Sequence, residues 1–155
     1  MAGQVDARLK ELGIEIPEAA APVANYVGYV AIGSLVFVSG QVPVQGGAFK
    51  YQGKLGADIP LEDGQAAARL CAINIIAQLK AACGGDLDRV QRIVKLGGFV
   101  NSAPDFTDQP KVINGASDLM VAVFGDKGRH ARAAVSAGAL PLGVAVEIDA
   151  VAQIA

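Results

Sequence analysis

The sequence predicts an α+β protein in which a mixed β-sheet packs two helices on one of its faces. Segments with strand and helix patterns follow one another in the order β-β-β-α-β-α-β-β, with short connections between them. A chain of 155 residues can bury a substantial core, so we expect residues 1–155 to form one domain. Hydrophobic residues make up 52% of the chain and charged residues 18%, which predicts that part of the apolar excess lies in a subunit interface.

The first half of the chain contains a predicted helix followed by three predicted strands. Apolar residues at i, i+4 and i+7 predict an amphipathic helix over residues 5–12, inside an N-terminal helical segment of about residues 3–13. An alanine-rich connector, residues 17–22, follows it. Gly40 in the second strand predicts a bulge or the close approach of another backbone. The strands are expected at residues 26–32, 35–44 and 48–52, with a Gly46-Gly47 turn before the last.

The middle of the chain predicts two helices with a long strand between them. A proline before the longer helix, acidic residues in its first turn and two glycines after its end mark its limits. A threonine N-cap, a proline in the first turn and a final glycine mark the second helix. The helices are expected at residues 61–83 and between Thr107 and Gly125, and the strand at residues 88–102.

Residues 131–149 predict a β-hairpin in which two apolar strands flank a turn at residues 140–143. Arg132 lies among small residues in the first strand, and Glu147 lies in the second. A guanidinium there either pairs with a buried carboxylate or binds an anionic ligand, and the space around it favours the ligand. In a regular hairpin Ser136 lies opposite Glu147, and Arg132 lies on the same face about 13 Å further along. One small substrate could then reach both side chains only with a shifted register or with two subunits.

The composition argues against several kinds of partner and site. A net charge of −2 without a basic cluster argues against nucleic acid as the main partner. The single histidine, His130, is expected in an exposed loop, so no metal site is predicted. The chain has no membrane-length apolar stretch and no N-terminal signal region, so we expect a cytoplasmic protein. Cys71 and Cys83 lie in one predicted helix and are about 18 Å apart, so both are expected to be reduced, buried thiols. Ser117, in the middle of the last predicted helix, is expected to make a local or interface hydrogen bond.

Five short motifs share an order and a spacing that are specific in combination. They are Ser39-Gly40-Gln41-Val42-Pro43, Gly64-Gln65-Ala66, Ala131-Arg132, Leu140-Pro141 and Val146-Glu147-Ile148. Over about residues 22–152 the chain resembles the YjgF/Rid proteins, the reactive-intermediate deaminases that are also labelled L-PSP endoribonucleases. The resemblance implies a chorismate-mutase-like fold, a homotrimer and a ligand site at each subunit boundary. It also implies the hydrolysis of 2-imino and enamine acids to 2-keto acids and ammonia without a cofactor.

The resemblance further implies a role for individual residues. Arg132 would anchor the substrate carboxylate, because its planar guanidinium grips a carboxylate with two parallel hydrogen bonds. Glu147 would hold the attacking water and transfer protons. The other residues implied to line the site are Tyr26, Ser39, Gly40, Phe106 and Ala134, with Tyr29 as a competing alignment for Tyr26.

Three departures from the archetypal members indicate a divergent branch. Ala134 stands where those members carry a cysteine, residues 106–124 form a longer segment, and the N-terminal helix is extra. Three functions therefore stay open. They are an imine hydrolase, a non-catalytic trimer that binds small carboxylates such as 2-keto acids as a metabolic regulator, and a ribonuclease. The absence of a histidine pair and of a basic surface argues against the ribonuclease.

Overall fold

The computed structural model describes residues 3–155, which form three α-helices, a five-stranded sheet and a separate two-stranded sheet. The helices are α1 (Gln4–Glu11), α2 (Leu61–Ala82) and α3 (Gln109–Phe124). The large sheet contains β1 (Tyr29–Ile32), β2 (Leu35–Gln41), β5 (Val90–Asn101), β6 (Ala131–Ala137) and β7 (Val146–Ile154). The small sheet pairs β3 (Val44–Gln45) with β4 (Ala48–Phe49). Short 3₁₀ turns precede β5, β6 and β7, namely η1 (Leu87–Arg89), η2 (Gly125–Gly128) and η3 (Pro141–Gly143).

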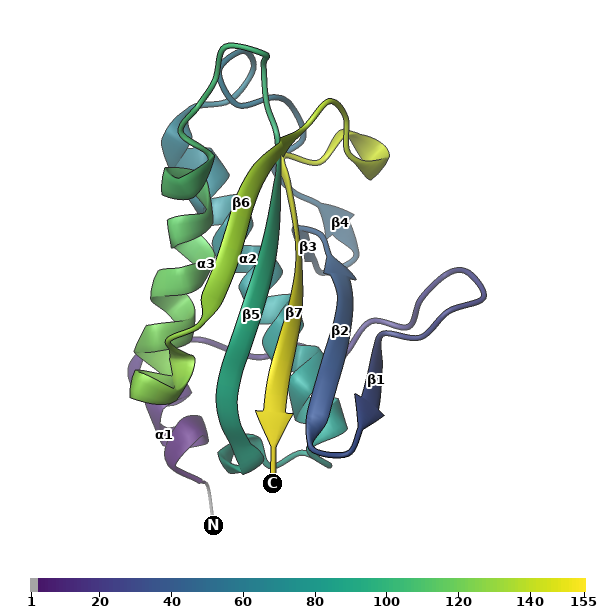
Figure 1. Ribbon diagram of the computed structural model, residues 1–155, viewed down its shortest axis with the longest axis vertical. Helices are drawn as coiled ribbons and strands as arrows, with labels where there is room; N and C mark the ends of the chain where they lie inside the picture. Colours follow the sequence, from purple (N-terminus) through teal and green to yellow (C-terminus); the bar gives the residue numbers. More distant parts are fainter. Residues whose placement is uncertain (1–2) are drawn as a thin grey trace.

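The large sheet is mixed, as the sequence predicts, and its strands lie in the order β1-β2-β7-β5-β6 (Figure 1). β5 and β6 run parallel, whereas the other neighbouring strands run antiparallel. α2 and α3 cover one face of the sheet (Figure 1). α1 packs beside α3, where Leu9 is buried and Arg8 Nε donates to the backbone carbonyl of Ala122. The α+β class is therefore confirmed, and the three helices correspond to the predicted N-terminal helix and the two helices predicted on one face of the sheet.

The hairpin predicted over residues 131–149 is wrong, because β5 lies between β6 and β7. The predicted turn is instead η3, in which Leu142 and Gly143 have φ angles of 60° and 69°. This turn connects β6 to β7 past the end of β5, as Figure 1 shows. Inserting β5 gives it hydrogen-bonded partners on both edges, whereas an isolated hairpin would leave β5 with an unpaired edge.

Two boundaries near the ends of predicted elements also differ. Thr107 is not the N-cap of α3, because the carbonyl of Asp108 accepts the first helical hydrogen bonds, from the backbone of Lys111 and Val112. The strand predicted from residue 26 begins only at Tyr29, since the chain before it turns.

The strand predicted over residues 35–44 stops at Gln41. Pro43 has no backbone N–H to contribute to a ladder, so the chain leaves the large sheet there and re-forms as β3. The bulge predicted at Gly40 is confirmed, because the register between β2 and β7 shifts between Val38 and Gln41.

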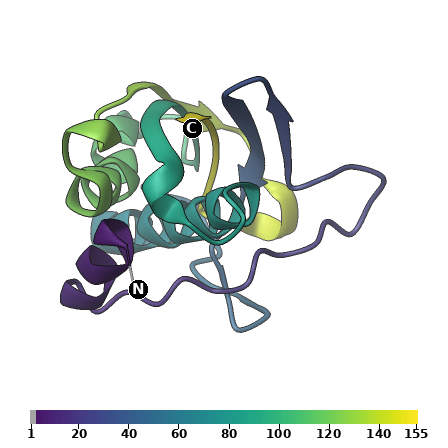
Figure 2. The same ribbon diagram turned by 90° about the horizontal axis from the view of Figure 1, so that it is seen from below.

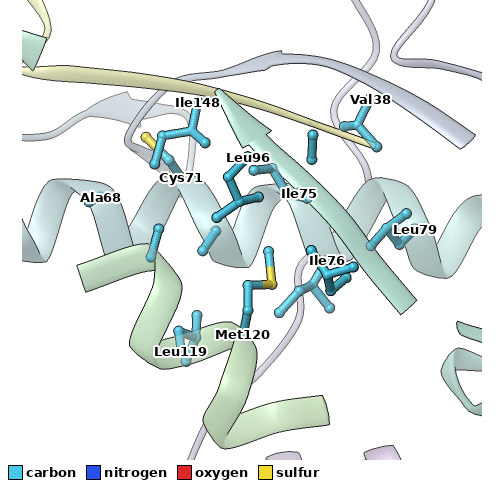
Figure 3. Close-up of a cluster of buried hydrophobic side chains, with 14 of the residues drawn as sticks. Val38, Ala68, Cys71, Ile75, Ile76, Leu79, Leu96, Leu119, Met120 and Ile148 are labelled. Atoms are coloured by element: carbon cyan, nitrogen blue, oxygen red, sulfur yellow. The ribbon is translucent and has the colours of Figure 1, made fainter. Parts of the chain in front are cut away.

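α2 lies at the centre of the core, where it packs against β2 and β7 of the sheet and beside α3. Figure 3 shows Ile75 and Ile76 of α2 close to Met120 of α3 and Leu96 of β5, and all four side chains are fully buried. Cys71 and Cys83 are buried and free, which confirms the prediction of reduced thiols. Burial raises the pKa of both thiols, so little reactive thiolate forms at neutral pH.

No segment within residues 3–155 covers the opposite face of the sheet, which we call the open face. Side chains from β1, β2, β5 and β6 make it apolar. They are Val30, Ile32, Leu35, Phe37, Phe99 and Val135, each at least 37% exposed. Exposed apolar side chains gathered on one face in this way are typical of a surface that binds another protein.

The connector between α1 and β1 runs along the helix layer to the β1 edge of the sheet, which Figure 2 shows from below. It lies against α2, where Gln78 Nε2 donates to the carbonyl of Ala20. None of the helices within residues 3–155 is both long and apolar enough to cross a membrane.

The close contact between α2 and α3 depends on Gly115. A Cβ at this position would lie 2.1 Å from the backbone oxygen of Gln65. We expect Gly115→Ala to destabilise the protein by about 1–3 kcal/mol, because the steric overlap exceeds the gain in helix propensity of about 1 kcal/mol. Urea denaturation measures this difference. Gly138→Ala is the control, since nothing lies near its Cβ and its effect should be small; equal effects of the two variants would contradict the prediction.

Candidate functional site

Arg132 lies on β6, the edge strand of the large sheet, and its side chain points to the helix layer. Its Nη1 donates to Ser117 Oγ at 3.1 Å, and its Nη2 donates to the backbone carbonyl of Pro110 at 3.2 Å. Both acceptors belong to α3. Arg132 forms no ion pair with any residue in the described part of the chain. The guanidinium is thus held by neutral groups, and its positive charge stays available to pair with an anionic ligand.

Glu147 lies on the open face, because it alternates along β7 with the buried residues Val146 and Ile148. It is half-buried, and the pKa of its carboxyl is raised, first by burial and second by the negative charge of Asp149. A Cβ at Gly40 would lie 2.7 Å from Glu147 Oε1, so the glycine of the bulge leaves the space that the carboxylate occupies. A carboxyl with a raised pKa can exchange a proton closer to neutral pH than an exposed one.

Arg132 and Glu147 do not lie on one face, contrary to the hairpin prediction. Arg132 is in register with Leu96 and Ala150, whereas Glu147 is in register with Phe99. The two Cα atoms are therefore two strands and three residues apart, about 14 Å. The odd offset also sends the two side chains to opposite faces of the sheet. Within one chain they cannot contact the same small molecule.

Ser136 is likewise not opposite Glu147. It pairs with Val100 of β5, and its Oγ lies 2.7 Å from Ser102 Oγ. Gln109 Nε2 donates both to Ser102 Oγ, at 3.4 Å, and to the carbonyl of Phe106, at 2.7 Å. Phe106 thus lies near the end of the β5–β6 pair, on the same side of the molecule as Arg132.

A cavity of about 740 Å³ lies at the other edge of the molecule, between β2, α2, the β3–β4 hairpin and the connector. Tyr26, Ser39 and Gly40 all line it. Ser39 Oγ donates to the carbonyl of Val27, which ties the strand to the end of the connector. Tyr29 instead packs against the core. Of the two competing tyrosines, the one that lines the cavity is therefore Tyr26.

The seven residues named from the sequence form two groups. Arg132, Ala134 and Phe106 belong to the β6 side, where Ala134 follows Arg132 on the same face of the strand and packs against the core. Tyr26, Ser39, Gly40 and Glu147 belong to the β2 and β7 side. Each group is local, and the structure of one chain does not bring the two groups together. Within residues 3–155 no group of three histidine, cysteine or acidic side chains could hold a metal ion.

Sequence reasoning missed two polar residues at Arg132. His130 is half-buried rather than exposed, and its Nε2 lies 2.8 Å from Ser117 Oγ. Its Nδ1 lies 2.6 Å from the carbonyl oxygen of Gly128. His130 lies directly before β6 and two residues before Arg132, so this spacing was a local signal for His130, whereas no local signal linked Ser117 to Arg132.

The chain is similar to known proteins over almost its whole length. Residues 6–153 match the family described as "YjgF/chorismate mutase-like, putative endoribonuclease". Protein TCP17 of Trypanosoma cruzi is 53% identical over 153 residues, 98% of this chain and 95% of that protein. The crystal structure of Atu1372 from Agrobacterium tumefaciens, a protein of unknown function, is 49% identical, with a TM-score of 0.92 over 97% of this chain and 92% of that one. The structure of E. coli TdcF with bound serine is 26% identical, with a TM-score of 0.64 over 89% of this chain and 94% of that one.

The raised pKa of Glu147 predicts a dependence of stability on pH. In the unfolded chain glutamate ionises near pH 4.3, whereas in the folded protein Glu147 ionises at higher pH. Between these values the unfolded state has lost the proton that the folded state still binds, so wild type loses stability as the pH rises. Glu147→Gln cannot ionise, so its stability relative to wild type should increase from pH 4 to pH 7.

Urea denaturation at the two pH values measures this change for Glu147→Gln. Asp105→Asn serves as the control, because Asp105 is exposed in the loop before α3. A stability difference between wild type and Glu147→Gln that stays constant with pH would contradict the prediction.

Proposed function

The chain belongs to the YjgF/chorismate-mutase-like family, and we propose that it hydrolyses reactive 2-imino and enamine acids to 2-keto acids and ammonia. One observation carries this proposal. Arg132 is half-buried, it is held in place by neutral acceptors on α3, and it has no carboxylate partner among the described residues. A guanidinium in that state is suited to bind the carboxylate of a small acid.

Hydrolysis of an imine mainly requires that the substrate and the attacking water are held in the correct relative position. When Arg132 holds the carboxylate, the neighbouring C=N carbon is fixed at one point, where a water molecule can attack it. Water forms a C–O bond to this carbon and passes one proton to the nitrogen, which gives a carbinolamine. When the C–N bond then breaks, the hydroxyl proton also moves to the nitrogen, so a C=O group remains and the nitrogen leaves as ammonia with both protons of the water. Glu147 can accept the proton from water and return it to the nitrogen, and its raised pKa suits both steps. We propose that no cofactor takes part, because the iminium carbon is already electrophilic.

Both groups of site residues are needed for this reaction, so we propose that they meet between two copies of the chain. Arg132 lies at the β6 side, whereas Glu147 and Gly40 lie at the β2 and β7 side. A contact that joins two different surfaces of identical chains is heterologous, and it closes into a ring when the rotation permits. We propose a ring of three subunits, with the apolar open face covered in the assembly.

A non-catalytic protein that binds small carboxylates is the second candidate. The bound serine in the similar TdcF structure supports it, because serine carries a carboxylate. Arg132 would have the same role in both cases, and only turnover distinguishes them. The ribonuclease named in the family description gains less support from this chain. The one histidine of this chain already contacts Ser117 and Gly128, so it is not free for acid–base catalysis on RNA. The net charge of the chain is −2, which does not favour binding of RNA.

We expect the protein to accelerate the release of 2-keto acid when 2-aminoacrylate or branched imino acids are generated by a pyridoxal enzyme or an amino-acid oxidase. Arg132→Ala should lower kcat/KM by about 100-fold, since the substrate loses its orientation, and Arg132→Lys should restore little of it. Glu147→Gln should lower kcat and leave carboxylate binding intact. Arg129→Ala is the matched control, because Arg129 is exposed and pairs with Asp126. If wild type gives no acceleration with several side chains, the hydrolase is excluded and the binding protein remains.

A second prediction tests the shared site. Sedimentation should show a trimer at micromolar concentration. When Arg132→Ala and Glu147→Gln chains are unfolded and refolded together, about a quarter of the sites should regain both wild-type groups. Activity should then exceed that of the two variants mixed only in the assay. A stable monomer, or no gain on joint refolding, would contradict a site between subunits.

A further inference from the structure

Arg132 is the first member of a chain of side-chain hydrogen bonds that extends away from the proposed substrate. Ser117 of α3 contacts Arg132 Nη1 at 3.1 Å and His130 Nε2 at 2.8 Å. His130 in turn contacts the carbonyl oxygen of Gly128 through Nδ1 at 2.6 Å. All three side chains are half-buried. Neither Ser117 nor His130 has a role in the reaction proposed above.

The backbone fixes the direction of every hydrogen bond in this chain. A carbonyl oxygen can only accept, so Nδ1 of His130 carries a hydrogen and donates it to Gly128. In the neutral imidazole Nε2 is then a bare acceptor, which receives the hydroxyl hydrogen of Ser117. The Ser117 oxygen therefore presents its lone pairs to Arg132. Hydrogen bonds aligned in one direction polarise one another, so the acceptor at Arg132 is strengthened.

Gly128 is held firmly enough to act as the fixed end. A Cβ at Gly128 would lie 2.1 Å from the backbone oxygen of Met120 in α3, so η2 packs directly on the helix at this point. The same helix supplies the second anchor of the guanidinium, since Arg132 Nη2 donates to the carbonyl of Pro110. Both anchors of Arg132 and the fixed end thus depend on α3.

We propose that Ser117 and His130 are positioning residues that orient the guanidinium of Arg132 for a carboxylate ligand. This inference rests on the proposed function, in which Arg132 binds the substrate carboxylate. A guanidinium has five N–H donors, and α3 accepts two of them, so three stay available to a ligand. A long, flexible side chain that is already ordered loses less conformational freedom on binding. Ser117 on α3 and His130 directly before β6 thereby increase affinity without touching the ligand.

The test measures the affinity of 2-ketobutyrate for the assembled protein by calorimetry, together with the thermal stability of each variant. Ser117→Ala should weaken binding about tenfold, and Ser117→Thr, which keeps the hydroxyl, should bind like wild type. His130→Leu should weaken binding less than Ser117→Ala, and His130→Gln should restore it, because its Oε1 can accept at the place of Nε2. Asn114→Ala is the control for a change in α3, since Asn114 is exposed one turn before Ser117.

NMR gives a readout that a purely structural role would not change. His130 is the only histidine of the chain, so its ring ¹⁵N signals are unambiguous. Wild type should show the Nδ1–H form, and 2-ketobutyrate should shift the Nε2 signal in wild type and in Ser117→Thr but not in Ser117→Ala.

The outcomes separate this inference from the proposed function. If Arg132→Ala abolishes binding and Ser117→Ala binds like wild type, the positioning role is overturned and the proposed function stands. If Ser117→Thr and His130→Gln fail to restore affinity although their thermal stability equals that of wild type, the positioning role is again overturned. If wild type does not bind 2-ketobutyrate, or Arg132→Ala binds it unchanged, both are overturned.

Discussion

The parallel pairing of β5 with β6 is the constraint on which the rest of the structure depends. Two parallel neighbours in sequence need a crossover, and α3 provides it. The crossover places β6 at the edge of the sheet, directs Arg132 against α3 and leaves the other edge of β5 for β7. The separation of Arg132 from Glu147 follows from this arrangement. An antiparallel hairpin would have put both on one sheet face in neighbouring strands, with no role for α3.

Local sequence patterns identify helices and strands in this chain, but they do not determine which strands pair. Apolar periodicity and glycine or proline limits identified α2 at residues 61–83 almost to its ends, because these signals act within a few residues. The same signals identified β6 and β7 as strands but assigned them to each other. Strand pairing depends on which apolar faces meet over long distances in the chain, and the turn-like residues 140–143 gave no information about β5.

The candidate site divides in the same way. The resemblance to a family indicated Arg132 and the Ser39-Gly40 segment, because short motifs retain their spacing, but it left open whether Tyr26 or Tyr29 faces the pocket. It could not indicate Ser117 and His130, since their contact requires the crossover that places α3 against β6. Nor could it show that the bulge at Gly40 makes space for the Glu147 carboxylate, because that contact joins residues far apart in the sequence.

The central position of β7 has a consequence for how the protein is made. β7 hydrogen-bonds to β2 on one side and to β5 on the other, yet it follows every other strand in the chain. Until residues 146–154 have been synthesised and released from the ribosome, no strand joins the β1–β2 pair to β5 and β6, so both parts keep an unpaired strand edge. The sheet therefore cannot form by steady growth during translation. The sheet is completed only when β7 becomes available. A nascent chain that stalled before Val146 would expose two unpaired strand edges, to which chaperones or other chains could bind.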